Sequence, residues 1–171
     1  KTWIGTDTWG SGQAGEITVQ AGRLELFSGA TISSNIYGDG NAGQVAVHAD
    51  ELHLDGLSTG IMSLAAPESQ GRAGRVVIEI AKLARLSNDA FIGSDSYGAG
   101  NAGGVSLRTG ALEAASGADI SSNTYRQGHA GTVSVQAAAL HHKGIITSID
   151  STSFEDGIGL AGDVTKVFDR L

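Results

Sequence analysis

The stretch Gly40-Asn-Ala-Gly-Gln-Val-Ala-Val47 decides the fold of this 171-residue chain, because its Ala-Gly pair returns at a nearly constant interval. Successive glycines of the pair are 28, 31, 29, 28 and 31 residues apart. Self-similarity at a period of this size is typical of a repeat architecture, in which each repeat packs mainly against its neighbours. The six copies begin near Ala14, Ala42, Ala73, Ala102, Ala130 and Ala161.

An alternating apolar segment follows five of the six Ala-Gly pairs. Val45 and Val47 follow Gly43 by two and four residues, and β-branched residues with a period of two indicate a strand with one buried face. A leucine stands nine residues after five of the glycines, at Leu24, Leu52, Leu83, Leu112 and Leu140. An isoleucine stands seventeen or eighteen residues after the same glycines, at Ile32, Ile61, Ile92, Ile120 and Ile149. Each repeat therefore predicts three short strands separated by turns.

Three short strands per repeat favour a β-solenoid. A helical repeat is excluded because Gly and Ser interrupt every amphipathic run and β-branched residues are frequent. We predict a right-handed parallel β-helix of about six coils of 28–31 residues, with successive coils about 4.8 Å apart. Equivalent apolar side chains would stack into ladders. We expect residues 1–171 to form a single β-helical segment and, because both ends fall inside the repeat, to be a fragment of a longer array.

The composition argues against several classes of protein. The formal net charge is −7 and the Lys and Arg residues are scattered, whereas a nucleic-acid partner requires a basic patch. Cysteine is absent, which excludes a disulfide framework, thiol catalysis and Cys-ligated zinc. No window approaches the roughly 18 unbroken apolar residues of a membrane helix, so we expect no membrane insertion.

Small and polar residues of the repeat are expected at turns. We interpret the Gly of each Ala-Gly pair as a corner residue with positive φ, which a residue without Cβ adopts freely. Asp or Asn recurs three residues after the isoleucine position, and we assign these side chains to a ladder of turns. They are Asp7, Asn35, Asp95 and Asn123. Two repeats carry two extra residues, after Ile61 and after Ile149, and we expect both longer loops on one edge of the rod.

An aromatic residue recurs five residues after the isoleucine position, except in the repeat that carries the only proline. This aromatic row consists of Trp9, Tyr37, Tyr97 and Tyr125. Such a row is a candidate surface for sugar rings or for a partner, and it is equally suited to stabilise the turns, since aromatic pairs contribute about 0.5–1.5 kcal/mol beyond their area. The long loop after Ile149 supplies further candidate contacts at Asp150, Phe154, Glu155 and Asp156.

Catalytic and metal-binding groups are not indicated. Pectin-degrading β-helices use clustered Asp residues, and a glycosidase needs two carboxylates at a fixed gap across a sugar. The acidic residues here fall in the turn ladder, on the long loop or singly. The adjacent His141 and His142 would point to opposite faces of a strand, so they cannot easily share one metal ion. We therefore predict no catalytic residue, no metal ligand and no cofactor.

Two runs of the sequence resemble a known family. GNAGQVAVHADELHLDG (residues 40–56) and GNAGGVSLRTGALEAASGADISSN (residues 100–123) are similar to the repeats of filamentous-haemagglutinin-like exoproteins, the secreted partners of two-partner secretion in Gram-negative bacteria. The resemblance covers essentially the whole chain and concerns the repeat shaft alone. It implies a right-handed parallel β-helix, export through an outer-membrane transporter and an extracellular or bacterial cell-surface location. It carries over no binding residues.

We therefore expect a non-catalytic, secreted β-helical shaft that acts in adhesion or extracellular structure. Its partners would be a host glycan or surface receptor, an outer-membrane transporter during export, and further copies of the chain joined end to end. Two alternatives stay open: a polysaccharide lyase or hydrolase on a β-helix scaffold, and a self-stacking filament subunit. An ice-binding solenoid is disfavoured because it would need flat rows of Thr.

Overall fold

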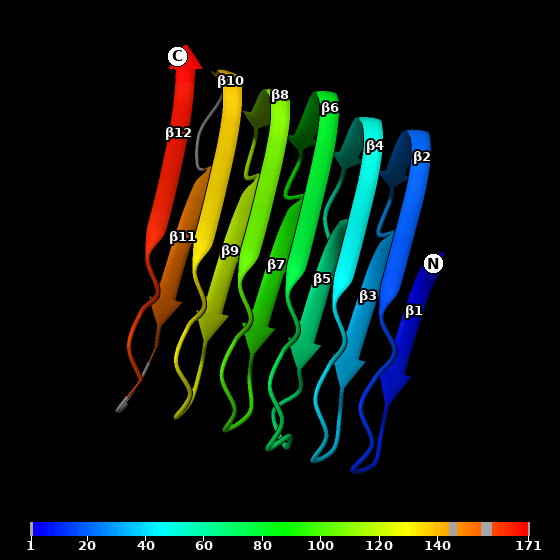
Figure 1. Ribbon diagram of the computed structural model, residues 1–171, viewed down its shortest axis with the longest axis vertical. Coiled ribbons are helices and arrows are strands. Elements are labelled where there is room, and N and C mark those ends of the chain that lie inside the picture. The colour runs from blue at the N-terminus through cyan, green and yellow to red at the C-terminus, as the bar shows by residue number, and fades with distance from the viewer. Residues whose placement is uncertain (1, 144–146, 155–158, 171) are drawn as a thin grey trace.

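The computed structural model describes residues 2–143, 147–154 and 159–170, and in these ranges the regular elements are strands (Figure 1). No helix that could span a membrane occurs in them. The short-strand sheet contains β1 (Trp3–Thr8), β3 (Thr31–Ile36), β5 (Gly60–Ala65), β7 (Phe91–Ser96), β9 (Asp119–Thr124) and β11 (Ser148–Ser153). The long-strand sheet contains β2 (Ile17–Phe27), β4 (Val45–Asp55), β6 (Val76–Ser87), β8 (Val105–Ala115), β10 (Val133–Lys143) and β12 (Val164–Arg170).

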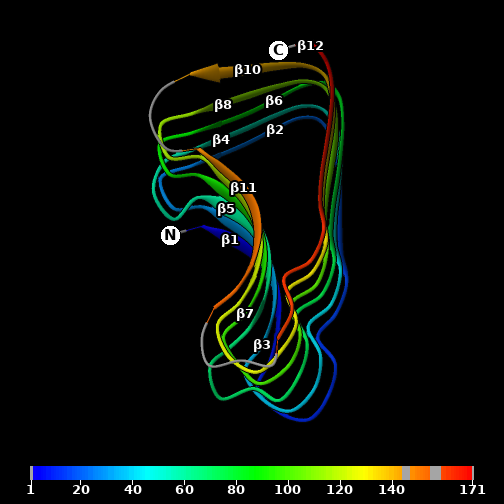
Figure 2. The ribbon, with the colours of Figure 1, turned by 90° about the vertical axis from the view of Figure 1, so that its left-hand side faces the viewer.

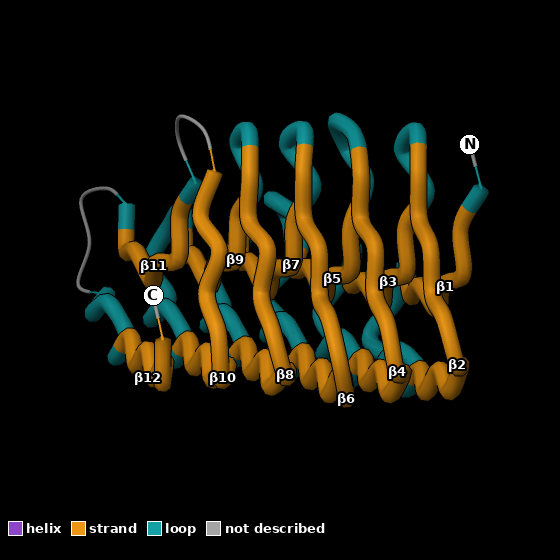
Figure 3. The backbone as a smooth tube through the Cα atoms, turned by 90° about the horizontal axis from the view of Figure 1, so that it is seen from above, coloured by secondary structure: helices purple, strands orange, loops and turns teal. Residues whose placement is uncertain are grey.

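The chain alternates between these two sheets, and each inner strand pairs in parallel with the strands two places before and after it. The N-terminal strand β1 and the C-terminal strand β12 lie at opposite ends of the stack (Figures 1 and 3). The result is a β-solenoid of about five turns, which confirms the predicted parallel β-helix and agrees roughly with the predicted number of coils.

Each long strand replaces two of the three short strands that the sequence predicted. Figure 2 shows that the long strands turn a corner partway along their length. The ladder pairing skips one residue at that corner, at Gly22 in β2, Gly110 in β8 and Ala138 in β10. Because pairing resumes within the same sheet, the bent strand supplies two sides of the coil and the short strand supplies the third.

Apolar side chains from all three sides meet in one continuous core. The predicted isoleucine ladder is confirmed: Ile61 pairs with Ile32 on one side and with Ile92 on the other, and all three side chains are fully buried. Ile120 and Ile149 continue this ladder. The two valine-rich ladders that begin at Ile17 and Val19 are confirmed by the same kind of pairing.

The predicted leucine ladder is wrong at Leu83. Strand β6 has 12 residues where β4 and β8 have 11, and the register shifts at its bend. Leu83 therefore lies beside Glu51, while the fully buried Ala84 pairs with Leu52 and Leu112. One extra residue in a strand would turn every following side chain to the opposite face. In β6 the extra residue lies in the corner as an irregularity, so the side chains that follow keep the same orientation as those of β4 and β8.

The Gly of the Ala-Gly pair has a different role from the predicted one. Positive φ among the described glycines occurs at Gly29, Gly56 and Gly117, which lie in the turns between long and short strands. At the Ala-Gly corner a Cβ on Gly103 would overlap the carbonyl oxygen of Gly74 in the preceding coil. Close approach of two backbones, and not backbone conformation, thus requires glycine at this corner.

A row of inward-pointing hydroxyl groups fixes these corners. The Ser34 hydroxyl accepts the Gly43 N–H at 2.9 Å and donates to the Gly15 carbonyl of the preceding coil at 3.0 Å. The same pair of bonds, within the coil and to the coil before, is made by Ser63, Ser94, Ser122 and Ser151. Since each hydroxyl satisfies buried backbone groups of two coils, the row holds every corner in register.

Candidate functional site

The outer face of the short-strand sheet carries most of the candidate residues. Along β3, Ile32, Ser34 and Ile36 point into the solenoid, so the alternate residues Ser33 and Asn35 point away from it. Figure 2 shows that this sheet is bowed between two rows of turns that project on the same side. We call this surface, with the residue that follows each short strand, the outer face.

The aromatic row lies along one edge of the outer face. Trp9 stacks on Tyr37 with ring centroids 4.1 Å apart, and Tyr97 stacks on Tyr125 at 4.3 Å. Phe154, predicted as a loop contact, extends the row by stacking on Tyr125 at 4.9 Å. The signal was present in the sequence, because Phe154 follows Ile149 by the same five residues that separate the other rings from their isoleucines.

Ala66 interrupts the aromatic row. Its N–H bonds to the Ile36 carbonyl as the Tyr97 N–H bonds to the Ala65 carbonyl, so it occupies the equivalent place in its coil. The ring planes in each stacked pair lie within 9° of parallel. Neighbouring rings therefore cover each other's faces, and this geometry favours the stabilising role of the row over a platform on which sugar rings stack.

Burial raises the pKa of the three tyrosine hydroxyls. Removal from water raises the pKa of Tyr37, and the negative charge of Asp7 adds to this. The pKa of Tyr97 and that of Tyr125 are raised mainly by the same loss of hydration. The interaction between the two hydroxyls lowers the pKa of Tyr97 and raises that of Tyr125. These hydroxyls stay protonated and neutral at physiological pH.

Two more aromatic residues lie at the opposite edge of the outer face. A Cβ on Gly5 would overlap the indole ring of Trp3, so this ring covers its own strand. A Cβ on Gly60 would likewise meet the Phe91 ring of the neighbouring strand β7. Every Trp and Tyr of the chain, together with Phe91 and Phe154, therefore lies on or beside this one face.

The carboxylates of the outer face belong to strands and not to turns. Asp7 and Asp95 were predicted in a turn ladder, and Asp150 on a loop, but they lie in β1, β7 and β11. Strand alternation also puts Asp119 of β9 on this face. The sequence pattern missed this because three residues after the isoleucine the chain is still extended; the turn begins only after the following residue.

Asp95 has the most perturbed environment of these carboxylates. Loss of hydration raises its pKa from 3.8 to about 7, and the negative charges of Asp119 and Asp150 add to the effect. The Asn123 N–H, which donates to Asp95 Oδ1 at 2.9 Å, acts in the opposite direction. Two other carboxylates accept hydroxyl donors: Asp119 accepts from Ser121 at 2.6 Å and from Ser148, and Asp150 accepts from Thr152 at 2.9 Å.

Asn35 carries an unsatisfied acceptor on the same face. Its Nδ2 donates to Asp7 Oδ1 at 2.9 Å and to Ser33 Oγ at 3.1 Å. Its Oδ1 is buried and accepts no hydrogen bond from the described residues, and the residue as a whole is only 4% exposed. A buried acceptor without a donor is costly, so the Asn35 amide is a locally destabilising group on this face.

Glu155 and Asp156, predicted as loop contacts, lie outside the described residues. Within the described ranges, no group of three or more His, Asp or Glu side chains is placed to hold a metal ion.

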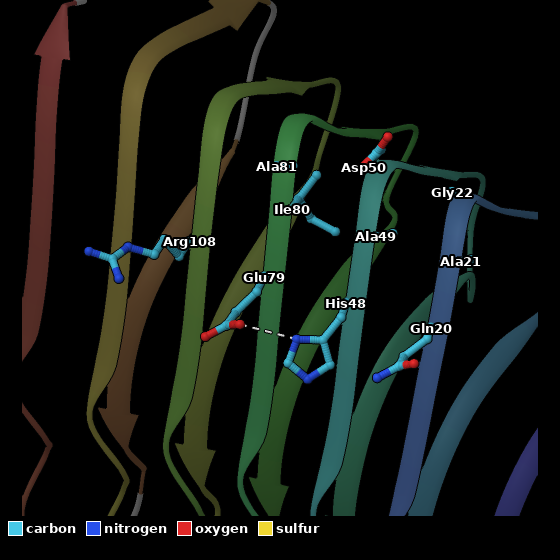
Figure 4. Close-up of a pocket in the computed structure, with 10 residues that line it drawn as sticks. All are labelled: Gln20, Ala21, Gly22, His48, Ala49, Asp50, Glu79, Ile80, Ala81 and Arg108. Carbon is cyan, nitrogen blue, oxygen red and sulfur yellow. Dashed lines mark hydrogen bonds and ion pairs between the residues drawn. The ribbon is translucent and has the colours of Figure 1, made fainter.

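The long-strand sheet has a second polar surface, which surrounds a shallow depression of about 770 Å³ (Figure 4). His48 Nδ1 lies 3.1 Å from Glu79 Oε2 of the next coil, and Arg108 lies one coil further on. Lys82 and Asp50 form a similar pair at 3.0 Å. Water screens exposed pairs of this kind, so they bind neighbouring coils weakly.

Comparison of the chain with known proteins finds no matching family model, no matching curated protein and no matching solved structure.

Proposed function

We propose that this chain is a non-catalytic shaft segment that acts in adhesion or extracellular structure. The observation that carries the proposal is the continuity of the interior. The isoleucine ladder, the valine-rich ladders and the hydroxyl row run through successive coils. Nearly every inward side chain therefore packs against the neighbouring coils. The outward rows of side chains remain for contact with other molecules.

A rod follows from this construction. Each coil is bonded to its neighbours by two parallel ladders and by the corner hydroxyls, so bending the stack would break many hydrogen bonds at once. Outward side chains then repeat at about 4.8 Å along the rod. Such a body is suited to span distance and to present rows of equivalent side chains.

The family and location belong to the same proposal. The two repeat runs that resemble filamentous-haemagglutinin-like exoproteins support a secreted chain that passes through an outer-membrane transporter and remains at the bacterial surface. A host glycan or surface receptor would be the external partner.

The test uses beads coated with the folded chain. We expect them to adhere to epithelial cells and extracellular matrix more than beads coated with the heat-unfolded chain, and we expect no product from polysaccharides incubated with the soluble chain. Absence of any adhesion above the unfolded control, or steady release of sugar products, would overturn the proposal.

One observation favours a polysaccharide lyase or hydrolase as a second candidate. The pKa of Asp95 is raised to about 7, as a general acid near neutral pH requires, and Asp119 and Asp150 lie on the same face. Incubation with pectin and related polysaccharides in the presence of Ca²⁺ decides between the two. Turnover that is abolished by Asp95→Asn would establish the enzyme.

A further inference from the structure

The outer face of the short-strand sheet carries charge of one sign. Its charged side chains are Asp7, Asp95, Asp119 and Asp150, and the described strand positions and aromatic row of this face include no Lys, Arg or His. The pKa of Asp95 is raised by burial and by the charges of Asp119 and Asp150 and is lowered by the Asn123 N–H; no cation is among its causes. The face therefore lacks internal compensation for its negative charge.

The outer surface of the long-strand sheet is different. There the acidic and basic side chains of successive coils pair, at His48–Glu79, Lys82–Asp50 and Arg85–Glu113. The same chain thus pairs several charges on one sheet and leaves the carboxylates of the other without a cationic partner. Because both sheets belong to every coil, this difference is a property of the face and not of the overall charge of −7.

The outer face also has more free hydrogen-bond acceptors than free donors. The hydroxyls of Ser121, Ser148 and Thr152 already donate to carboxylates of the face, and the Asn35 amide donates to Asp7. Carboxylate lone pairs remain, because each carboxylate can accept about four hydrogen bonds. What the face lacks is donors.

Aromatic and apolar groups border these acceptors. Trp3 and Phe91 lie at one edge and the aromatic row at the other, while Met62 and Leu64 of β5 are half-buried between them. Lys and Arg side chains combine an apolar stem with a charged donor head, and they contact ring surfaces and carboxylates together. Asp95, Asp119 and Asp150 stand on the adjacent strands β7, β9 and β11, which span about 10 Å along the rod.

We propose that the outer face of the short-strand sheet binds an extended, Lys- and Arg-rich segment of a partner protein, with the cationic heads on Asp95, Asp119 and Asp150 and the stems against the bordering rings. This inference rests on the proposed function, in which it identifies the adhesive surface and the class of receptor. A neutral glycan would use the same edges but would not depend on the carboxylates.

The experiment measures binding of an octalysine peptide by calorimetry at pH 8 and low salt, with octaglutamate and a neutral oligosaccharide as comparison probes. The test variant is Asp119→Asn/Asp150→Asn. The matched control is Glu16→Gln/Asp163→Asn, which removes the same charge at exposed sites outside the face. Thermal unfolding verifies that each variant is folded. Should the test variant not fold, Asp95→Asn replaces it, because Asn123 occupies the equivalent place in the next coil.

We expect octalysine affinity to fall about tenfold or more in the test variant and less than about twofold in the control, since only the former loses direct charge-assisted contacts. Equal weakening in both variants would show attraction by net charge alone and would overturn the inference. Binding of the neutral oligosaccharide that is lost in the test variant while octalysine binding is kept would overturn it too.

The outcome is separable from that of the proposed function. If the beads adhere but octalysine affinity is the same in the test and control variants, the shaft proposal stands and the basic partner is excluded. If the chain releases sugar products, the shaft proposal falls whatever the peptide does.

Discussion

The Ser122 hydroxyl lies between two coils and binds both: it accepts the Gly131 N–H at 2.9 Å and donates to the Gly103 carbonyl at 2.6 Å. The side chain is completely buried. A hydroxyl stands two residues after the isoleucine position in every coil, which makes this contact the repeating corner bond of the solenoid.

Ser122→Ala should destabilise the fold by about 1–3 kcal/mol, because a buried backbone N–H and a carbonyl lose their partner together. Urea unfolding followed by circular dichroism measures the effect. Ser134→Ala, at an exposed site in β10, is the matched control and should change stability by less than about 0.5 kcal/mol. Equal effects of the two substitutions would contradict the assigned role of the corner hydroxyl.

Gly103→Ala tests the close approach of backbones at the Ala-Gly corner. Its Cβ would overlap the Gly74 carbonyl, and overpacking against backbone should cost about 2–4 kcal/mol. Gly22→Ala is the control, since a Cβ at Gly22 meets no atom within 4 Å. The control should leave the urea midpoint unchanged or raise it slightly. A tolerated Gly103→Ala would mean that the coils can separate at the corner without loss.

Asp95→Asn tests the linkage between pH and stability. The pKa of Asp95 is raised from 3.8 to about 7 in the folded chain, so folding favours its protonated form. The contribution of protonated Asp95 to the stability of the fold is therefore fully present below about pH 4 and is lost as the pH rises to about 7. We expect the variant to match the parent at pH 4 and to exceed it at pH 8 by on the order of 2–4 kcal/mol. Urea midpoints from pH 4 to pH 8 that run parallel for both proteins would refute this.

Tyr125→Leu should destabilise the fold more than Phe154→Leu. Tyr125 stacks between Tyr97 and Phe154, whereas Phe154 has one described ring partner. With about 0.5–1.5 kcal/mol for each stacked pair, we expect about 1–3 kcal/mol for Tyr125→Leu and about half of that for Phe154→Leu. Thermal unfolding ranks the two variants. The reverse order would show that the row contributes little stability, and it would restore the interpretation of the rings as a ligand surface.

Lys166→Val tests the self-stacking alternative. Lys166 occupies a position of the valine-rich ladder beside Val135, where a charged side chain opposes burial under another coil. We expect the substitution to increase end-to-end association, seen as larger species in sedimentation velocity, whereas Lys166→Arg should behave as the parent chain. Filaments formed equally by the parent and by both variants would show that Lys166 does not oppose stacking.

The repeat in the sequence was sufficient to predict how coils stack. Ile61 lies between Ile32 and Ile92 because a parallel solenoid must put residues one period apart side by side. The same argument failed at Leu83, where the period is intact in the spacing from Gly74 but one residue is absorbed at the corner of β6. Spacing along a chain does not reveal where a strand bends.

The candidate site was predicted less well than the fold. The aromatic row was found from its spacing, and Phe154 could have been found in the same way. Asp95 and Asp150 were assigned to turns or loops, since Asp and Asn favour turns when only local preference is considered. That they share one sheet face with Asp119 follows from the boundaries of the short strands.

The sequence by itself determined the coil, the parallel stacking and the isoleucine and valine-rich ladders, since these depend on a period and on the alternation of side chains along a strand. The tertiary structure alone decided which backbones nearly touch at Gly103, which hydroxyls bind two coils, and which sheet carries uncompensated carboxylates. The physical reason is that hydration, close contact and charge compensation depend on neighbours from other coils, about 30 residues away in the chain and about 5 Å away in space.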